Sequence, residues 1–327
     1  MAHFPPRDLV GYGPDTPKFE WPGGAKLAIS FVVNYEEGGE TSITNGDERN
    51  EIGLNESPPS QPRYGSRDVN METMYEYGSR VGVWRIARAF EKRDMRFTVY
   101  AVGRAVELNP SCIKTLHAAG HEIGSHHYRW TNYGALPLET VREHTESCIK
   151  AIRDACGQPP TGWYTGGPGG PTPESRREVI KACKKEGVEL VWESDSYNDD
   201  LPYYTWEFED VIGGPMLIIP YTLDNNDLKF AVPPGFSNPN DFVDYIKDSI
   251  DVLLEEGRSG HPKMMSVGLH CRLMGRPGRA AALDRVLEYV KSLGPEVWVA
   301  TRSEIAQFWT KTFPKPTKRA AAAVAAV

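Results

Sequence analysis

Short apolar runs typical of buried strands alternate with amphipathic segments typical of helices from Ala25 to Thr312. We expect strands over 27–33, 97–102, 122–125, 161–164, 189–192, 216–221, 264–269 and 297–300. We expect helices over 73–93, 111–119, 138–156, 174–186, 240–256, 279–291 and 303–312. Strict alternation makes the strands parallel, and about eight of them favour closure. The pattern therefore predicts an α/β fold, a distorted β/α barrel of about seven or eight parallel strands.

The barrel pattern fills residues 25–313, which we expect to form a single catalytic domain. Residues 1–24 are rich in proline and predict an irregular N-terminal arm. Residues 38–70, rich in Gly, Asn, Ser and Pro, predict a long loop insertion of the kind that covers a site or joins an interface. Residues 314–327 predict a flexible tail.

Net charge and composition argue against some classes of binding partner. The formal net charge is −7 and no basic stripe precedes the tail, which argues against a nucleic-acid partner. No signal peptide is visible and no apolar run approaches the roughly 20 residues of a spanning helix, so no membrane partner is expected. Five cysteines without CxxC spacing indicate reduced packing residues. These features predict a cytoplasmic protein that acts on a small molecule.

Four strings place polar residues where apolar runs end. They are Asn34-Tyr35-Glu36-Glu37-Gly38, Ser125-His126-His127-Tyr128-Arg129-Trp130, Ser194-Asp195-Ser196-Tyr197 and Leu269-His270-Cys271-Arg272. Carboxylates and imidazoles from different strand ends are how a β/α barrel builds an active site. The strings therefore predict an enzyme.

The acids and histidines are the first candidates for catalysis. Adjacent strand residues point to opposite faces, so at most one of Glu36 and Glu37 faces the barrel mouth unless the chain turns. By the same rule His126 could orient a substrate carbonyl or bind a metal while His127 faces elsewhere. His270 can donate a proton to a leaving nitrogen, because an unperturbed imidazole has a pKa of about 6.5.

Other residues are candidates for substrate contact. Asp195 could hold a histidine in one tautomer or bind polar groups of the substrate. The segment Trp163-Tyr164-Thr165-Gly166-Gly167 could form a pocket wall whose backbone N–H groups stabilise an oxyanion, or it could be a simple turn. No G-x-G-x-x-G after a strand, no Walker A string and no G-x-S-x-G is present, so nucleotide-binding and serine-hydrolase functions lack their motifs.

The four strings, in this order, resemble the polysaccharide deacetylase superfamily (NodB homology, carbohydrate esterase family 4) from about Ala25 to Trp309. The resemblance is stronger to its cofactor-independent, PuuE-type allantoinase branch. It rests on the strings PRDLVGYG, NYEEGGE, MYEYGSRVGVWR, SHHYRW, GWYTG, ESDSYNDDLPY, IPYTLDNND and GLHCRLMGRPGR. It implies a distorted β/α barrel, hydrolysis of a C–N bond and a homo-oligomer such as a tetramer.

The resemblance also implies roles for single residues. Glu36 stands where the superfamily has its catalytic base, and Glu37 where it has a metal-binding Asp. His126 matches the first metal histidine, and Trp130 replaces the second. His270 matches the general acid, and Asp195 the Asp motif. Losing one imidazole from a three-ligand set should weaken zinc binding. We therefore expect no cofactor, with zinc on Glu37, His126 and His127 as the alternative.

This chain departs from the branch at two positions. Gly167 stands where the branch has an Arg after W-Y-T-G, and His127 stands where the branch has Gly. We expect Trp130, Trp163, Tyr164, Asp195 and Arg272, with His127, to surround the substrate.

Three functions follow from these residues. The first is hydrolysis of a small cyclic amide such as an allantoin-like ureide or a cyclic imide, by water that Glu36 or Glu37 activates. The second is metal-dependent de-N-acetylation of an oligosaccharide, as the wider superfamily implies. The third is a catalytically inactive barrel that acts as a binding protein.

Overall fold

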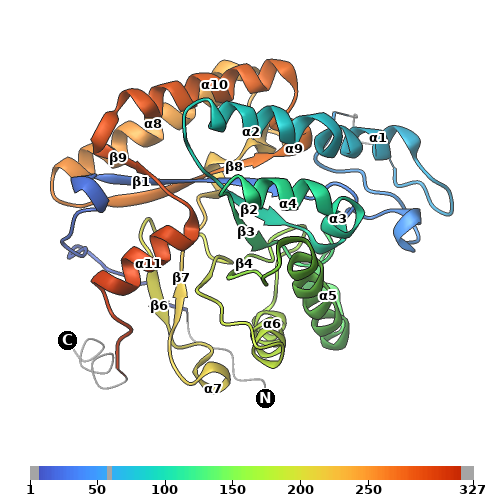
Figure 1. The fold of residues 1–327 in the computed structure, drawn as a ribbon, viewed down its shortest axis with the longest axis horizontal. Helices are drawn as coiled ribbons and strands as arrows, with labels where there is room; N and C mark the ends of the chain where they lie inside the picture. Colours follow the sequence, from blue (N-terminus) through green and yellow to red (C-terminus); the bar gives the residue numbers. More distant parts are fainter. Residues whose placement is uncertain (1–6, 57–60, 318–327) are drawn as a thin grey trace.

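The computed structural model describes residues 7–56 and 61–317, and its centre is a curled, mostly parallel sheet (Figure 1). The sheet has nine strands in the described residues, in the order β6-β7-β5-β4-β3-β2-β1-β8, and β9 also pairs with β1. An isolated bridge between Asn226 and Gly268 joins the segment after β7 to β8. The sheet thus curls into a half-barrel with helices packed around it, which confirms the predicted distorted β/α barrel.

The strands, in chain order, are β1 (Leu27–Tyr35), β2 (Thr98–Ala101), β3 (Glu122–Ser125), β4 (Gly162–Trp163), β5 (Trp192–Glu193), β6 (Tyr203–Thr205), β7 (Met216–Ile218), β8 (Lys263–His270) and β9 (Val297–Val299). The helices are α1 (Val69–Tyr77), α2 (Val83–Glu91), α3 (Gly103–Leu108), α4 (Pro110–Ala118), α5 (Leu138–Cys156), α6 (Pro173–Lys185), α7 (Glu209–Ile212), α8 (Pro239–Arg258), α9 (Cys271–Met274), α10 (Pro277–Ser292) and α11 (Arg302–Thr312).

Two apolar cores lie on opposite faces of the sheet. All nine residues of β1 are buried, and they alternate between the faces. Phe31 packs on Phe90 of α2 with ring centroids 5.1 Å apart, in the layer between sheet and helices. Val32 belongs to the inner core with Tyr100 and Trp192. Side-chain alternation therefore decides which residues enter the barrel.

The inner core is closed from one end by a buried arginine. Arg302, the first residue of α11, is fully buried and donates to the hydroxyls of Ser194 and Ser266 and to the carbonyl of Pro220. These acceptors come from the segments of β5, β8 and β7, so Arg302 ties three parts of the half-barrel together. A buried guanidinium needs such partners because an unpaired donor costs about 1–3 kcal/mol.

The N-terminal arm lies on its own domain where it is described. The Trp21 indole donates to the Lys263 carbonyl at 2.8 Å, and Phe19 packs edge-on against Trp309 at 5.3 Å. The predicted tail includes residues 318–327, and the predicted loop insertion includes residues 57–60; both stretches lie outside the described residues.

Several elements differ from the expected pattern. Strand β6 runs antiparallel to β7 at the sheet edge, and the sequence did not predict it. The expected helix over 73–93 begins at Val69 and contains a π-helical turn at Gly78–Gly82 between α1 and α2. That turn brings the helix against the end of β8: a Cβ on Gly82 would lie 2.0 Å from the Cys271 carbonyl oxygen.

We predict that Gly82→Ala destabilises the protein, because the added methyl group has no room beside Cys271. Overpacking of this kind costs about 1–3 kcal/mol, measurable as a lower urea midpoint. The control is Gly278→Ala in α10, where nothing lies within 4 Å of the added carbon. Alanine is favoured over glycine in a helix by about 1 kcal/mol, so this midpoint should hold or rise. Equal midpoints for both variants would contradict the packing argument.

Candidate active site

Four polar side chains from three strand ends meet inside the barrel mouth. Glu36 follows β1, His126 follows β3, His270 ends β8 and Arg272 lies in α9. Parallel pairing of β1 with β8 places Asn34 opposite His270, so the ends of the two strands lie side by side. The exposed fractions are 0% for Glu36, 2% for His126, 5% for His270 and 2% for Arg272. The cluster is therefore almost completely enclosed.

Glu36 is the centre of this cluster. Its Oε1 lies 3.2 Å from His126 Nε2 and 3.4 Å from His270 Nε2. Its Oε2 accepts a hydrogen bond from Arg272 Nη1 at 2.7 Å. Burial alone would raise the pKa of Glu36, but the positive charges of His270 and Arg272 outweigh it and hold the pKa well below its usual value. Glu36 is thus a buried carboxylate that stays ionised.

Asp227 fixes the orientation of His270. Its Oδ1 accepts from His270 Nδ1 at 2.6 Å, and its Oδ2 accepts from the backbone N–H groups of His270 and Met274 at 2.8 and 3.1 Å. The second imidazole nitrogen, Nε2, therefore points at Glu36. Burial would lower the pKa of His270, but the carboxylates of Glu36 and Asp227 raise it to about 9. At neutral pH His270 is a charged proton donor.

His126 has the opposite character. Its Nδ1 contacts the Thr165 carbonyl oxygen at 2.9 Å, and a carbonyl can only accept, so Nδ1 carries the hydrogen. In its neutral form the ring then presents an acceptor at Nε2, toward Glu36. Glu36 Oε1 and His126 Nε2 are a pair of acceptors that can hold a proton between them. The cluster has an accepting side and, at His270 and Arg272, a donating side.

Asp195 positions this histidine through one peptide. Its carboxylate accepts the N–H groups of Thr165 at 2.9 Å and Gly166 at 2.8 Å, and the Thr165 carbonyl holds His126. Burial, with repulsion from Glu193, raises the pKa of Asp195 to about 7. The expectation that N–H groups of the Trp163–Gly167 segment stabilise an oxyanion is wrong for Thr165 and Gly166, because Asp195 occupies both.

Glu37 and His127 make different contacts from their neighbours Glu36 and His126, and Glu37 Oε1 also lies 3.8 Å from Arg272 Nη1. Glu37 accepts backbone N–H groups of Glu36 and Arg272, each at 3.1 Å. Burial raises the pKa of Glu37 to about 7, although Arg272 offsets part of the effect. His127 stacks on Tyr133 with ring centroids 3.6 Å apart, in the layer below the helices. The structure therefore does not bring His127 to the predicted substrate site, because its backbone takes a left-handed conformation (φ 61°) and its ring packs on Tyr133.

The aromatic candidates divide in the same way. Tyr164 belongs to the inner core, 5.1 Å from the His126 ring, and its hydroxyl meets that of Tyr197 at 2.9 Å. Trp163 lies in the outer core against His127, so the structure does not place it at the predicted substrate site. The Trp130 ring lies 5.7 Å from the Arg272 guanidinium, beside the cluster.

Comparisons with known proteins identify the family to which this chain belongs. A family model described as polysaccharide deacetylase matches residues 67–191. A Schizosaccharomyces pombe protein, provisionally named a polysaccharide deacetylase, is 44% identical over 322 residues, 94% of this chain and 98% of that protein. The chain belongs to the polysaccharide deacetylase family.

Two solved structures share its half-barrel over nearly the whole chain. The crystal structure of PuuE allantoinase is 46% identical with a TM-score of 0.87, and the match covers 96% of this chain and 100% of that one. A Pseudomonas aeruginosa protein, provisionally named a polysaccharide deacetylase, is 45% identical with a TM-score of 0.86, over 95% and 100% of the two chains. The chain is therefore a hydrolase of this family.

The alternative prediction is a zinc ion bound by Glu37, His126 and His127, and the positions of these side chains do not fit it. Both Glu37 oxygens accept backbone N–H groups, and His127 stacks on Tyr133 away from His126. Within residues 7–56 and 61–317, no group of three His, Cys, Asp or Glu side chains is arranged to hold a metal ion. The set Glu37, His126 and His127 thus does not fit zinc, and the absence of a cofactor stays a prediction.

Asp227 is the functional residue that sequence reasoning missed. It lies in the IPYTLDNND string, but 43 positions before its partner His270. Asp224 and Asp227 are equivalent in sequence terms, and the fold buries Asp227 while Asp224 stays exposed. The one sequence signal for Asp227 was that it is an acidic residue in the segment that follows β7.

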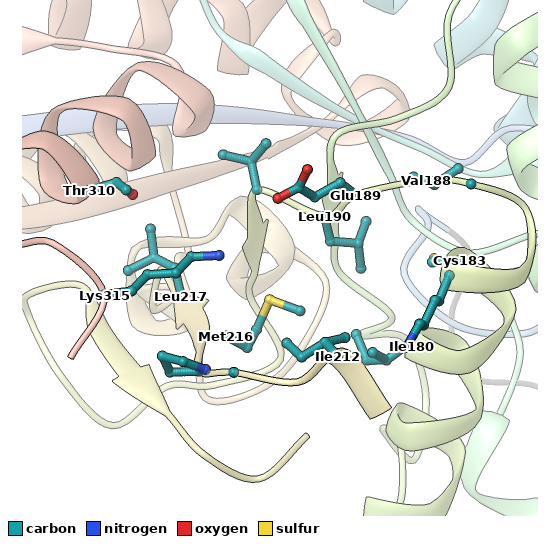
Figure 2. A pocket seen from close by; sticks show the side chains of 15 residues that line it. Ile180, Cys183, Val188, Glu189, Leu190, Ile212, Met216, Leu217, Thr310 and Lys315 are labelled. Carbon is teal, nitrogen blue, oxygen red and sulfur yellow. The ribbon is translucent and has the colours of Figure 1, made fainter. Parts of the chain in front are cut away.

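A cavity with a largely apolar lining lies away from the Glu36 cluster. This cavity of about 440 Å³ lies before β5 and β7, lined by Leu190, Ile212, Met216 and Leu217, with Glu189 and Lys315 at its rim (Figure 2). It opens at the strand starts, whereas the Glu36 cluster lies at the strand ends. Strand ends carry the chemistry in β/α barrels.

No helix in the described part of the chain combines the length and apolar character needed to cross a membrane. The cytoplasmic location and the homo-oligomer stay predictions.

We predict that Asp227→Asn lowers the pKa of His270 from about 9 by roughly 1 to 3 pH units, because it removes one of two stabilising charges. A raised pKa in the folded state gives stability that is full below about pH 6.5 and is lost as pH rises through about 9. In Asp227→Asn, the free energy of unfolding should no longer show this loss between about pH 6.5 and about pH 9. NMR titration of the His270 ring measures the pKa directly.

Asp224→Asn is the matched control, since Asp224 is exposed and bonds the Tyr245 hydroxyl rather than a histidine. It should leave the His270 midpoint in place. A midpoint still near 9 in Asp227→Asn would show that this acid does not set the charge of His270.

Proposed function

We propose that this protein hydrolyses a C–N bond in a small cyclic amide of the ureide or imide class. The observation that carries the proposal is the contact of one buried carboxylate, Glu36, with two imidazoles of opposite character. His126 offers an acceptor and His270 a proton, within 3.2 and 3.4 Å of the same oxygen. Amide hydrolysis needs a proton taken from water and a proton given to the leaving nitrogen.

The roles follow from the hydrogen bonds. Water that approaches Glu36 Oε1 loses its proton to the Glu36–His126 pair and attacks the ring carbonyl carbon. The positive charges of His270 and Arg272 stabilise the oxyanion that develops. His270, held by Asp227, then protonates the ring nitrogen as the C–N bond breaks. Asp195 acts through the backbone N–H groups that it holds, and Glu37 holds the backbone N–H of Arg272 while its Oε1 lies 3.8 Å from the Arg272 guanidinium.

Enclosure supports a small substrate. None of Glu36, His126, His270 and Arg272 is more than 5% exposed, and a polymer chain needs an open groove to reach such groups. The similarity to PuuE allantoinase, at 46% identity, supports a ring of the allantoin type. We therefore favour a cyclic amide over an oligosaccharide.

De-N-acetylation is the second candidate, because the Schizosaccharomyces pombe and Pseudomonas aeruginosa relatives carry the name polysaccharide deacetylase. Its metal-dependent form requires a ligand set that Glu37, His126 and His127 do not supply.

A substrate panel separates these functions. Allantoin, hydantoin, dihydrouracil, succinimide and N-acetylglucosamine oligomers are incubated with the protein, with and without a chelator. We expect ring opening of at least one cyclic amide, unchanged by the chelator, and no acetate from the oligomers. Acetate release that the chelator abolishes would favour the deacetylase instead, and no turnover of any compound would favour a binding protein.

Glu36→Gln should lower kcat on the cyclic amide by about 10²- to 10⁴-fold, because it removes the proton acceptor while keeping the shape of the side chain. Glu40→Gln is the matched control. Glu40 is also buried, but burial raises its pKa to about 7, and it accepts from the Gly38 N–H in its own loop. The control should stay within a few-fold of the unmodified protein. Similar losses in both variants would argue that burial of charge, and not proton transfer, is what the assay detects.

A further inference from the structure

Arg272 has donors that the protein itself does not use. Its Nε donates to the Leu54 carbonyl at 2.9 Å, and its Nη1 donates to Glu36 Oε2 at 2.7 Å. Its Nη2 is buried and has no hydrogen-bond partner. The side chain is 1% exposed, so bulk water does not satisfy this nitrogen. A guanidinium carries five N–H groups in a rigid plane, and here the Nη2 pair is left over.

A buried N–H group without a hydrogen-bond partner destabilises the protein unless a ligand accepts its hydrogen bond. A buried donor without a partner destabilises a protein by about 1–3 kcal/mol, and more when the group is charged. The guanidinium cannot turn to another partner. Its Cζ lies over the Tyr75 ring, 4.2 Å from the ring centroid, and both Nε and Nη1 already donate hydrogen bonds. Arg272 is therefore an acceptor-binding group fixed in advance beside the reacting centre.

The contacts of Glu36 indicate which oxygen of the substrate Arg272 Nη2 binds. The two imidazoles approach Oε1 of Glu36, so the bond that breaks lies on that side of the carboxylate. Arg272 binds the other oxygen, Oε2. An oxygen bound by this guanidinium at Nη2 then belongs to a second polar group of the ring and not to the carbonyl attacked beside Oε1.

The charges of the cluster indicate that this second group is neutral. Glu36 and Asp227 pair with the cations Arg272 and His270, and the Glu37 carboxyl also lies 3.8 Å from Arg272 Nη1, so the cluster has no unpaired positive charge. An anionic substrate would add a buried charge without a counterion, which is unfavourable in an enclosed site. A carbonyl oxygen satisfies Nη2 without changing the balance.

We infer that Arg272 Nη2 binds a second carbonyl oxygen, one that is not attacked, so that the site selects neutral rings with two carbonyls over rings with one. The inference rests on the proposed hydrolysis of cyclic imides and ureides, and it names the side chain that distinguishes them from rings with one carbonyl. Arg272 is then the specificity-determining residue of the site.

The test compares succinimide with 2-pyrrolidinone, which has the same ring and lacks one carbonyl. Their dissociation constants are measured by calorimetry in the Glu36→Gln background, where rings stay intact and intrinsic reactivity plays no part. We expect succinimide to bind at least about 10-fold more tightly, because a site built for a polar group strongly disfavours analogues that lack it. Equal binding of the two rings, or binding of neither, would overturn the inference without any change at Arg272.

Two lysine variants then assign the preference to one side chain. Arg272→Lys keeps a positive charge near Glu36 but lacks Nη2, so the preference should fall to within about twofold. Arg276→Lys is the matched control, because Arg276 also stacks on a tyrosine, Tyr77 at 3.7 Å, outside the cluster. It should keep the full preference. A preference that survives in Arg272→Lys would overturn the inference.

The outcome is independent of the substrate panel. If no ring is hydrolysed but succinimide is still preferred through Arg272, the proposed reaction fails and the assignment of Arg272 holds. If rings are hydrolysed and both bind equally, the reaction holds and the assignment fails.

Discussion

The separation of neighbouring polar side chains at the strand ends is the constraint on which the site depends. After β1 and β3 the polar pairs separate: Glu36 and His126 meet in the cluster, whereas Glu37 holds backbone N–H groups and His127 packs on Tyr133. The residues of the cluster share one enclosed space because β1 pairs with β8 through to His270. Glu37 has structural contacts of its own: it holds the backbone of β1 against α9.

The enclosed cluster is stable only because its charges are coupled. A lone buried carboxylate would be neutralised, and a lone buried imidazole would lose its proton. Here Glu36 keeps its charge because of His270 and Arg272, and His270 keeps its proton because of Glu36 and Asp227. Each ionised state depends on the others. Removing any one member should therefore disturb the remaining three, and single substitutions in the cluster will report on the network as well as on the residue.

Sequence patterns were enough for the fold and for part of the site. The long alternating runs predicted most strands and helices, and α5 and β3 begin and end where expected. Single side chains were harder, because sequence does not show the face on which a residue lies once the strand has ended. Asp227 was missed since its role depends on a contact across 43 positions. The π-helical turn was missed since it reflects close approach to Cys271, which is a tertiary effect.

The same contacts explain how a member of this family can lack a zinc ligand set and retain a reactive centre. A metal ion in a hydrolase stabilises negative charge on oxygen and makes water more acidic. In this chain the positive charge comes from Arg272 and protonated His270, both fixed by carboxylates and carbonyls of the protein. These groups do not coordinate water as a metal ion does, so in the proposed reaction the Glu36–His126 pair accepts its proton. A centre of this kind suits an activated carbonyl, and the carbonyls of cyclic imides and ureides are polarised by their second acyl group. The enclosed site, its balanced charge and the free nitrogen of Arg272 thus all favour the same class of small, neutral ring.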